Sequence, residues 1–404
     1  MSISFNYHAH ANFASTKCNM KRTINCGVFL WLLLTVACGT KTSENKCSIV
    51  VANQLSGIHS DLGREIHRAL AIVKDEIKEM NLKLIEIREI DTESTPSVAR
   101  AQIERAISRW NAKIIVGSIL SSETREFMPS VLKKGITIIA NGSSDPEIRN
   151  LPYRKERDGF FRNWPADDFE GKIMAEYIIS FNRAKEIVVL YANDSYAKSL
   201  AKAFSDRFSE LGGKILKITA YPKDLTNFYD VLSAIKVNEV EGIYMVGFPP
   251  DLAAIYDTVR TRFGENGKTI PIYSAVGINT GEFAALTQIK LDNLIFTTPA
   301  VDESSATYFR FKKQYQAKFK GEEPGIVAAI AYDALVISID AILKAGCDSK
   351  KIADYLYDHP AFDGVSGPTA FDGLGDVVTK GININYYEKG RKLLGETYYA
   401  TKSK

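Results

Sequence analysis

Small hydroxyl residues and glycines gather in three loops of the sequence, where their chemistry suits a bound anion. The loops read Gln54-Leu-Ser56-Gly57, Ser121-Ser122-Glu-Thr124 and Asn141-Gly142-Ser143-Ser144. Serine hydroxyls and free backbone amides at the start of a helix donate hydrogen bonds to an anion, and the helix dipole adds to the attraction. The same residue types also cap helices, which explains any single loop. Three such loops together favour a site for a small carboxylate.

The sequence contains none of the common motifs for nucleotide binding or catalysis. Gly-x-Gly-x-x-Gly, Gly-x-x-x-x-Gly-Lys-Ser/Thr, Gly-x-Ser-x-Gly and His-Glu-x-x-His are all missing. His59, His67 and Asp61 could in principle ligate a metal ion, but their spacing fits no standard set. We therefore predict a protein that is not an enzyme and that uses neither a metal ion nor a cofactor. An α/β enzyme with an unrecognised site is the alternative.

Apolar periodicity predicts strands and helices that alternate along the body of the chain. The expected strands span 48–52, 84–90, 113–117, 136–140, 187–191, 215–221, 242–247, 271–275, 294–298 and 382–387. The expected helices span 62–80, 98–110, 122–133, 169–179, 197–211, 228–237, 252–263, 303–319 and 326–344. This pattern implies an α/β fold with two doubly wound parallel sheets. Ligands bind beyond the carboxyl ends of such strands, where the hydroxyl loops fall.

Residues 1–37 are predicted to be a secretory signal peptide. An apolar run over 27–37 follows the Lys21-Arg22 pair, and it is too short to cross a bilayer, which takes about 20 apolar residues. Met20 opens the signal, so we interpret 1–19 as an upstream over-call of the start codon, with a long n-region as the alternative. No later stretch is expected to reach transmembrane length.

The signal ends in Leu34-Thr35-Val36-Ala37-Cys38, which resembles a bacterial lipobox. The cysteine of a lipobox is lipidated and becomes the first mature residue. Cys38 is therefore the predicted lipid-attachment site, and 38–46 is the predicted tether. The usual leucine three places before the cysteine is Thr35 here, and a plain secretory signal with an incidental cysteine is the alternative. The expected location is the periplasm or the cell surface, with the lipid as the only contact with a membrane.

The cysteines and charges of the mature chain fit an exported protein that does not bind nucleic acid. Only Cys47 and Cys347 remain after Cys38. Exported proteins keep disulfides, so these two could pair; two independent buried thiols are the alternative. The chain has 51 basic and 48 acidic residues, and the excess lies within 1–37. A neutral body gives no support to a nucleic-acid partner.

From about Ser48 to the carboxyl terminus, short motifs follow the order seen in one known family. The motifs are Leu55-Ser-Gly57, Ile115-Val-Gly117, Ile139-Ala-Asn-Gly-Ser-Ser-Asp-Pro-Glu147, Phe161-Arg162-Asn-Trp-Pro-Ala-Asp167, Tyr191-Ala-Asn-Asp-Ser-Tyr196, Gly364-Val-Ser-Gly367-Pro368 and Phe371-Asp372-Gly-Leu-Gly375-Asp376. The chain thereby resembles the type I periplasmic solute-binding proteins of ABC transporters, specifically the branched-chain amino acid (leucine/isoleucine/valine-binding) family. The resemblance implies a monomeric receptor that delivers a small ligand to an ABC permease. A sensory lipoprotein of the same fold is the alternative.

The resemblance also implies two α/β lobes that are joined by three crossovers and close on a ligand. Lobe one would comprise 47–163 with 299–366, and lobe two 164–298 with 367–404. The crossovers are expected near 162–164, 298–299 and 366–368.

The resemblance assigns the ligand site as well. The ligand carboxylate would meet Ser121, Gly142 and Ser144, while Tyr196 and Phe248 would cover the ligand. Trp164, at the first crossover, would either line the cleft or pack in the core. The full set of candidate ligand-binding residues is Ser56, Ser121, Ser122, Gly142, Ser143, Ser144, Asp167, Tyr196, Phe248 and Val276.

One position departs from the family pattern. Amino-acid-binding relatives commonly carry an acid after the strand expected at 271–275, where this chain has Val276. A buried ammonium group without a partner is costly. Asp167 could supply the charge, or it could instead cap the helix expected at 169–179. The ligand therefore stays open between an amino acid, a small amide and a carboxylate.

Overall fold

The computed structural model describes residues 46–181, 183–222, 225, 227–234 and 239–399. They fall within residues 44–404, which form one unit of the chain. The predicted signal peptide, Cys38 and the tether up to residue 45 lie outside the described residues. The predicted α/β fold class is confirmed, because the described part of the chain holds a five-stranded sheet and a seven-stranded sheet with helices packed on them.

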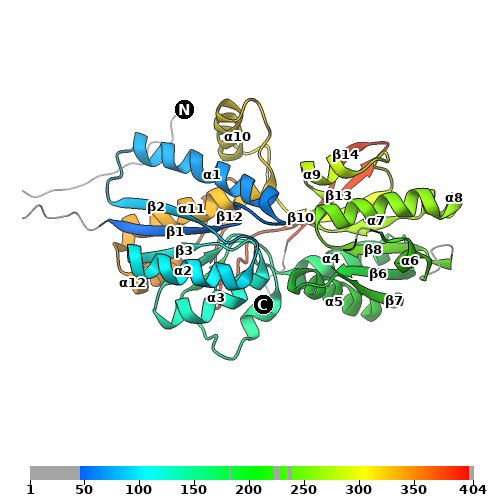
Figure 1. The fold of residues 1–404 in the computed structure, drawn as a ribbon, viewed down its shortest axis with the longest axis horizontal. Helices are drawn as coiled ribbons and strands as arrows, with labels where there is room; N and C mark the ends of the chain where they lie inside the picture. The colour runs from blue at the N-terminus through cyan, green and yellow to red at the C-terminus, as the bar shows by residue number, and fades with distance from the viewer. Residues whose placement is uncertain (1–45, 182, 223–224, 226, 235–238, 400–404) are drawn as a thin grey trace, which may run out of the picture. The chain divides into compact units, whose positions relative to one another are not determined.

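The five-stranded sheet is the centre of lobe one, drawn mainly in blue, cyan and orange in Figure 1. All of its pairings are parallel, and its strands in spatial order are β2 (Ile85–Asp91), β1 (Cys47–Asn53), β3 (Ala112–Val116), β4 (Thr137–Ala140) and β5 (Phe160–Arg162). Its helices are α1 (Ser60–Glu79), α2 (Pro96–Trp110), α3 (Ser121–Lys133), α10 (Ala306–Lys318), α11 (Ile326–Ala345) and α12 (Ser349–Asp358), with a short 3-10 turn, η1 (Pro146–Asn150).

Successive residues of β1 face opposite layers of helices, which explains the unbroken apolar run of this strand. Ile49 and Val51 belong to the core cluster that includes residues of α1, α10 and α11. Val50 and Ala52 belong to the cluster that includes residues of α2 and α3. A parallel strand covered on both faces carries apolar residues without alternation. Each large aliphatic side chain buried in this way contributes about 1.5–3 kcal/mol.

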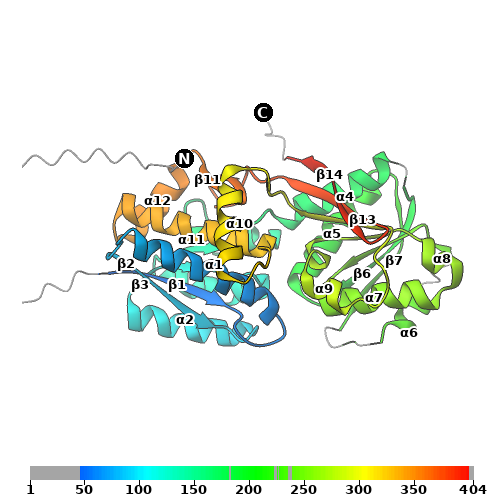
Figure 2. The ribbon, with the colours of Figure 1, turned by 90° about the horizontal axis from the view of Figure 1, so that it is seen from above.

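The seven-stranded sheet is the centre of lobe two. Its strands in spatial order are β14 (Arg391–Tyr398), β13 (Ile382–Glu388), β10 (Leu294–Pro299), β9 (Ile272–Ser274), β8 (Gly242–Val246), β6 (Glu186–Ala192) and β7 (Lys214–Tyr221). The strands from β10 to β7 are parallel, whereas β13 and β14 are antiparallel and lie at one end, shown in red in Figure 2. Its helices are α4 (Asp167–Ser180), α5 (Ser195–Glu210), α6 (Tyr229–Ser233), α7 (Pro249–Arg262), α8 (Gly264–Thr269) and α9 (Gly281–Leu286), with the 3-10 turn η3 (Val276–Ile278).

The segment after the small hairpin of lobe one stays in contact with that lobe. The chain passes from one sheet to the other after β5 and returns after β10. Beyond the small hairpin of β11 (Phe362–Gly364) and β12 (Gly367–Thr369), however, Asp376 pairs with Arg162 as an extra parallel bridge on β5. Gly375 permits this approach, since a Cβ there would lie 1.8 Å from the Phe160 carbonyl oxygen. Residues 371–376 therefore pack on lobe one.

One expectation about long apolar segments was wrong. Among the described residues, α11 is long and apolar enough to cross a membrane by length and composition alone. Most of it is buried, and Ile330, Leu335 and Ile342 belong to the core cluster of lobe one. The length and composition of α11 thus fit the central helix of a lobe that packs against α1.

A disulfide joins the two remaining cysteines. Cys47 begins β1, and Cys347 lies between α11 and α12; their Cα atoms are 5.5 Å apart. The bond closes a loop over a sequence separation of 300 residues. It therefore links the first strand of lobe one to the connection between α11 and α12, the last two helices of the described chain.

Removing this disulfide is expected to lower the free energy of unfolding by about 2–5 kcal/mol, because a long cross-linked loop restricts the unfolded chain. The Cys47→Ser/Cys347→Ser double variant should unfold at a lower urea concentration than the oxidised protein. Treating the wild type with a reductant should produce the same shift. An unchanged midpoint, together with two thiols that react in the untreated wild type, would contradict the bond.

Candidate ligand-binding site

A cavity of about 70 Å³ lies between the two lobes. Lobe one contributes Leu62, Glu65, Ile119, Leu120, Ser121, Gly142, Ser144, Ile326 and Val327. Lobe two contributes Asp194, Tyr196, Gly247, Phe248, Pro249, Val276, Gly277, Asn279 and Thr280, and Trp164 joins from the first crossover. The lining is mostly apolar, so its few polar groups decide how a ligand is oriented.

The structure brings six of the ten predicted ligand-binding residues to this cavity: Ser121, Gly142, Ser144, Tyr196, Phe248 and Val276. The other four, Ser56, Ser122, Ser143 and Asp167, are not among the lining residues. The Ser56 hydroxyl donates to Asp91 at 2.7 Å, and the Ser143 hydroxyl donates to the Ser118 carbonyl at 2.9 Å. These two serines therefore hold loops next to the cavity.

The polar end of the cavity belongs to lobe one. Ser121 opens α3, and Gly142 and Ser144 follow β4, so all three lie at the carboxyl ends of neighbouring parallel strands. The Ser121 Oγ accepts the Asp145 amide at 3.3 Å, which leaves its hydroxyl hydrogen free to donate. A Cβ at position 142 would lie 2.3 Å from the Ile119 side chain, so only glycine fits there. The Ser121 hydroxyl beside an open backbone suits a carboxylate, and the Ser144 hydroxyl lies within hydrogen-bonding reach of both the cavity and the Asp167 carboxyl group.

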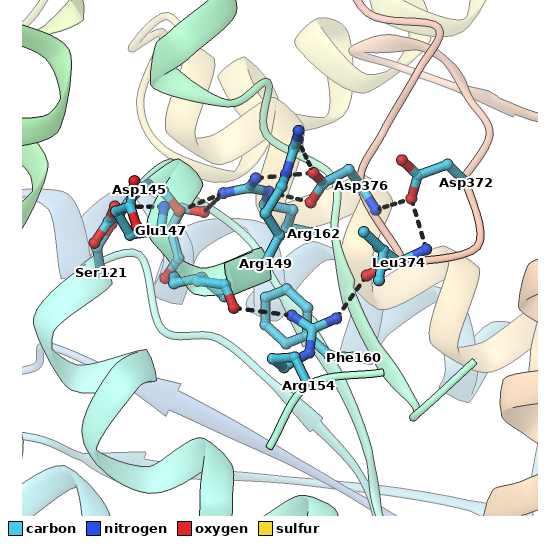
Figure 3. A network of polar contacts seen from close by, with 12 residues as sticks. Ser121, Asp145, Glu147, Arg149, Arg154, Phe160, Arg162, Asp372, Leu374 and Asp376 are labelled. Carbon is cyan, nitrogen blue, oxygen red and sulfur yellow. Dashed lines mark hydrogen bonds and ion pairs between the residues drawn. The ribbon is translucent and has the colours of Figure 1, made fainter. Parts of the chain in front are cut away.

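A buried arginine holds the loop that carries Gly142 and Ser144. The Arg162 Nη1 donates to the carbonyls of Ser143 and Asp145 at 3.3 and 2.8 Å. The same guanidinium donates to both Asp376 oxygens at 2.6 and 3.0 Å, and Arg149 forms a second ion pair with Asp376 (Figure 3). Burial by itself raises the pKa of Asp376, but the positive charges of Arg162 and Arg149 lower it overall. This network links the ligand loop to the third crossover.

The apolar part of the cavity brings together aromatic rings from both lobes. Phe248, just before α7, packs its ring 4.1 Å from the ring of His59 in lobe one and 5.9 Å from that of Tyr196. Trp164 is almost fully buried where the chain leaves lobe one. Aromatic walls of this kind suit an apolar or aromatic group on a ligand.

A sequence profile of the periplasmic binding protein family matches residues 46–384. The chain belongs to the periplasmic binding protein family. An amino acid binding protein from Pseudomonas aeruginosa is 24% identical over 354 residues, covering 85% of this chain and 91% of that protein. The family consists of extracytoplasmic binding proteins, which confirms the predictions of export and of a protein that is not an enzyme.

Two crystal structures place the fold of this binding protein. That of a leucine binding protein from Thermotoga maritima has a TM-score of 0.79 at 24% identity and covers 87% of this chain and 99% of its own. That of an R. palustris solute-binding protein in complex with benzoate has a TM-score of 0.76 at 16% identity and covers 89% and 98%. Both likenesses confirm the type I periplasmic binding protein fold.

Asp167 of this binding protein is buried at the first turn of α4. Its amide donates to the Ser144 carbonyl at 2.9 Å, and its carboxyl group accepts the Ser199 hydroxyl at 2.5 Å. Burial raises the pKa of Asp167 well above its ordinary value, and the nearby Glu170 adds to the rise. The residue before it, Ala166, is the N-cap, so Asp167 is not the helix cap that the sequence suggested. Its carboxyl group favours the neutral form.

Glu65 is a cavity residue that sequence reasoning missed. It lies on α1, and its Oε2 accepts the Ala328 amide of α11 at 3.1 Å. Burial raises the pKa of Glu65 to about 7. In the sequence it follows the exposed Arg64 and reads as part of a solvated helix face. Glu65 lies three residues after the apolar Leu62, and this spacing places both on the same face of the helix, which was the available signal of its position.

Glu170 makes the stability of the binding protein depend on pH. Burial raises its pKa from 4.5 to about 7, against a hydrogen bond from the Thr297 hydroxyl at 2.6 Å. Between these two values the folded protein keeps a proton that the unfolded chain releases. The contribution of this proton to the free energy of unfolding is therefore fully present below pH 4.5 and is lost as the pH rises through 7.

We expect the ligand-free wild type to lose a few degrees more of its Tm between pH 5 and pH 8 than the Glu170→Gln variant, which keeps the acceptor for Thr297. Glu176→Gln, at a half-exposed position of the same helix that pairs with Arg207, should lose as much of its Tm over this pH range as the wild type. Thermal melts at several pH values provide the measurement. Parallel curves for the wild type and Glu170→Gln would contradict the assignment.

Proposed function

We propose that this protein is the solute receptor of an ABC importer and that it binds a small carboxylate-bearing ligand, an amino acid or an aromatic acid, between its lobes. One observation carries the proposal: Ser121, Gly142 and Ser144 face an apolar wall from both lobes within one cavity. The relatives add support, since one is named for leucine and another is in complex with benzoate. Both ligands join a carboxylate to an apolar group.

In this proposal lobe one binds the carboxylate, and lobe two closes Tyr196 and Phe248 over the apolar part of the ligand. A ligand that touches both lobes only in the closed form shifts the open–closed equilibrium toward that form. The permease then distinguishes loaded from empty receptor by its closure. No covalent step is involved.

We also propose that residues 1–37 are removed on export and that Cys38 carries a lipid. Residues 38–46 would then tether the receptor to a membrane without spanning it. The support for this part is the sequence motif that ends at Cys38.

A thermal-shift panel tests the binding proposal. Copurified ligand is first removed by unfolding and refolding with the disulfide intact. The panel holds amino acids, their deaminated analogues, small amides and benzoates. A ligand at 100 times its Kd should add about 2.7 kcal/mol of stability and raise the Tm by a few degrees. A panel in which no carboxylate shifts the Tm would overturn the proposed function.

A further inference from the structure

A carboxylate in the mostly apolar cavity requires a physical reason. Glu65 lines the cavity from lobe one, yet the structure gives it a single hydrogen-bond donor, the Ala328 amide. Gly325 makes room for it, because a Cβ there would lie 2.2 Å from Oε2. An acid that is removed from water without a cationic partner is costly to ionise.

No cationic side chain among the described residues forms an ion pair with Glu65. Arg68, one turn along α1, donates instead to Glu322, with 2.9 Å between Nη2 and Oε1. Arg64 is exposed, and both arginines act on Glu65 only through their charges, which lower its pKa. The space beside Glu65 belongs to the cavity, so a cation that neutralises this carboxylate would come from the ligand.

We infer that Glu65 binds a cationic amine of the ligand, so that the protein selects amino acids over simple carboxylates. The inference rests on the proposed function and narrows its ligand class. Val276 cannot accept a hydrogen bond from an amine, and its side chain packs against the core cluster of lobe one. Glu65 instead places the amine-binding group on the lobe that also carries Ser121 and Ser144. Both charged ends of an amino acid would then bind to lobe one, and lobe two would supply the apolar cover.

The surroundings of Glu65 set how binding depends on pH. The charges of Asp61, Arg64 and Arg68 on α1 act on Glu65, the charge of Glu65 acts on Tyr308 and Tyr315 of α10, and the Ala328 amide of α11 donates to it. Burial is the largest influence on its pKa, which is raised to about 7. An amine stabilises the ionised form, so its binding at pH 7 should release about half a proton per ligand. The affinity for amino acids should fall as the pH drops below 7.

Calorimetry on the full-length protein, purified as its host produces it and freed of ligand, tests the inference. The probes are L-leucine with 4-methylpentanoate and L-phenylalanine with 3-phenylpropanoate, each pair differing by the amine. The variants are Glu65→Gln, which keeps an acceptor for Ala328, and Glu76→Gln as a matched control on α1 away from the cavity. Measurements in two buffers of different ionisation enthalpy report the released proton.

We expect Glu65→Gln to weaken binding of the amino acid at least tenfold, to leave the deaminated acid unchanged, and to abolish proton release; Glu76→Gln should change none of these. If Glu65→Gln lowers the affinity for the amino acid and for its deaminated analogue equally, then Glu65 only positions α11, and the inference is overturned. Deaminated acids that bind the wild type as tightly as amino acids would also overturn it, while the receptor function stands. If no probe binds, the inference is overturned, and the proposed function falls with it when no carboxylate of the thermal-shift panel binds either. Proton release by the wild type decides the matter if Glu65→Gln fails to fold.

Discussion

Replacing Ser121 and Ser144 together by alanine is expected to weaken the binding of a carboxylate ligand by about 100-fold or more. Each hydroxyl donates to a charged group inside a cavity that excludes water, and such a hydrogen bond contributes about 1.5–3 kcal/mol. The fold should persist, because the Ser121 Oγ accepts only one long hydrogen bond, from Asp145 at 3.3 Å, and because the Asp167 carboxyl group keeps the Ser199 hydroxyl as a donor when that of Ser144 is lost. Calorimetry with the best ligand of the panel provides the measurement.

Ser122→Ala is the matched control for this experiment. Ser122 follows Ser121 on α3 but does not line the cavity, so its loss should leave the affinity unchanged. If the double variant binds the ligand as tightly as the wild type, the carboxylate is held elsewhere and the assignment of this end of the cavity is wrong.

Replacing Asp376 by alanine is expected to lower the free energy of unfolding by about 3–5 kcal/mol, because it leaves the fully buried Arg162 without its carboxylate. Arg162 also positions the carbonyls of Ser143 and Asp145, so ligand affinity should fall as well. Urea unfolding measures the first effect, and calorimetry measures the second.

Asp354→Ala provides the comparison for Asp376. Asp354 forms ion pairs with Lys350 and Arg157 at the surface of α12, where solvent screens them. Its removal should change the unfolding midpoint little. An Asp376→Ala variant that unfolds together with Asp354→Ala would show that the buried network does not stabilise the crossover.

The elements that could be predicted from the sequence are those whose burial leaves a regular pattern. The unbroken apolar run of β1 and the three-and-four spacing of α1 each reflect what covers them, and both were found within two residues of their ends. The strand β14 was missed because it is almost wholly exposed and shows no alternation. The helix α12 was also missed, although Ile352 and Leu356 are buried at helical spacing. The contact of Gly375 with Phe160 could not be predicted, because it joins residues that are far apart in the sequence.

The residues of the candidate site also differ in whether a sequence pattern marks them. Ser121, Gly142 and Ser144 follow predicted strands, so the rule that ligands bind at the carboxyl ends of strands leads from the sequence to these three cavity-lining residues. Glu65 follows an exposed arginine on α1, so its position in the sequence suggests contact with solvent. Its carboxylate is covered by α11, whose Ala328 amide, 263 residues later in the chain, donates to it. Ser56 and Ser143 have the right residue type in the right loops, but local hydrogen bonds to Asp91 and Ser118 engage them.

The divided lobe one has a consequence for how the protein reaches its folded state in the cell. Its first strands are made early, but α10 and α11, which cover Ile49 and Val51, come after nearly all of lobe two. A chain that crosses a membrane amino end first therefore exposes the apolar face of β1 until α10 and α11 have also crossed. Cys47 likewise stays without its disulfide partner until Cys347 has crossed. Holding chaperones outside the cytoplasm would be needed during this interval, since exposed apolar strands aggregate. A fragment that ends before α11 would contain most of the cavity residues but lack the helix that completes the core of lobe one.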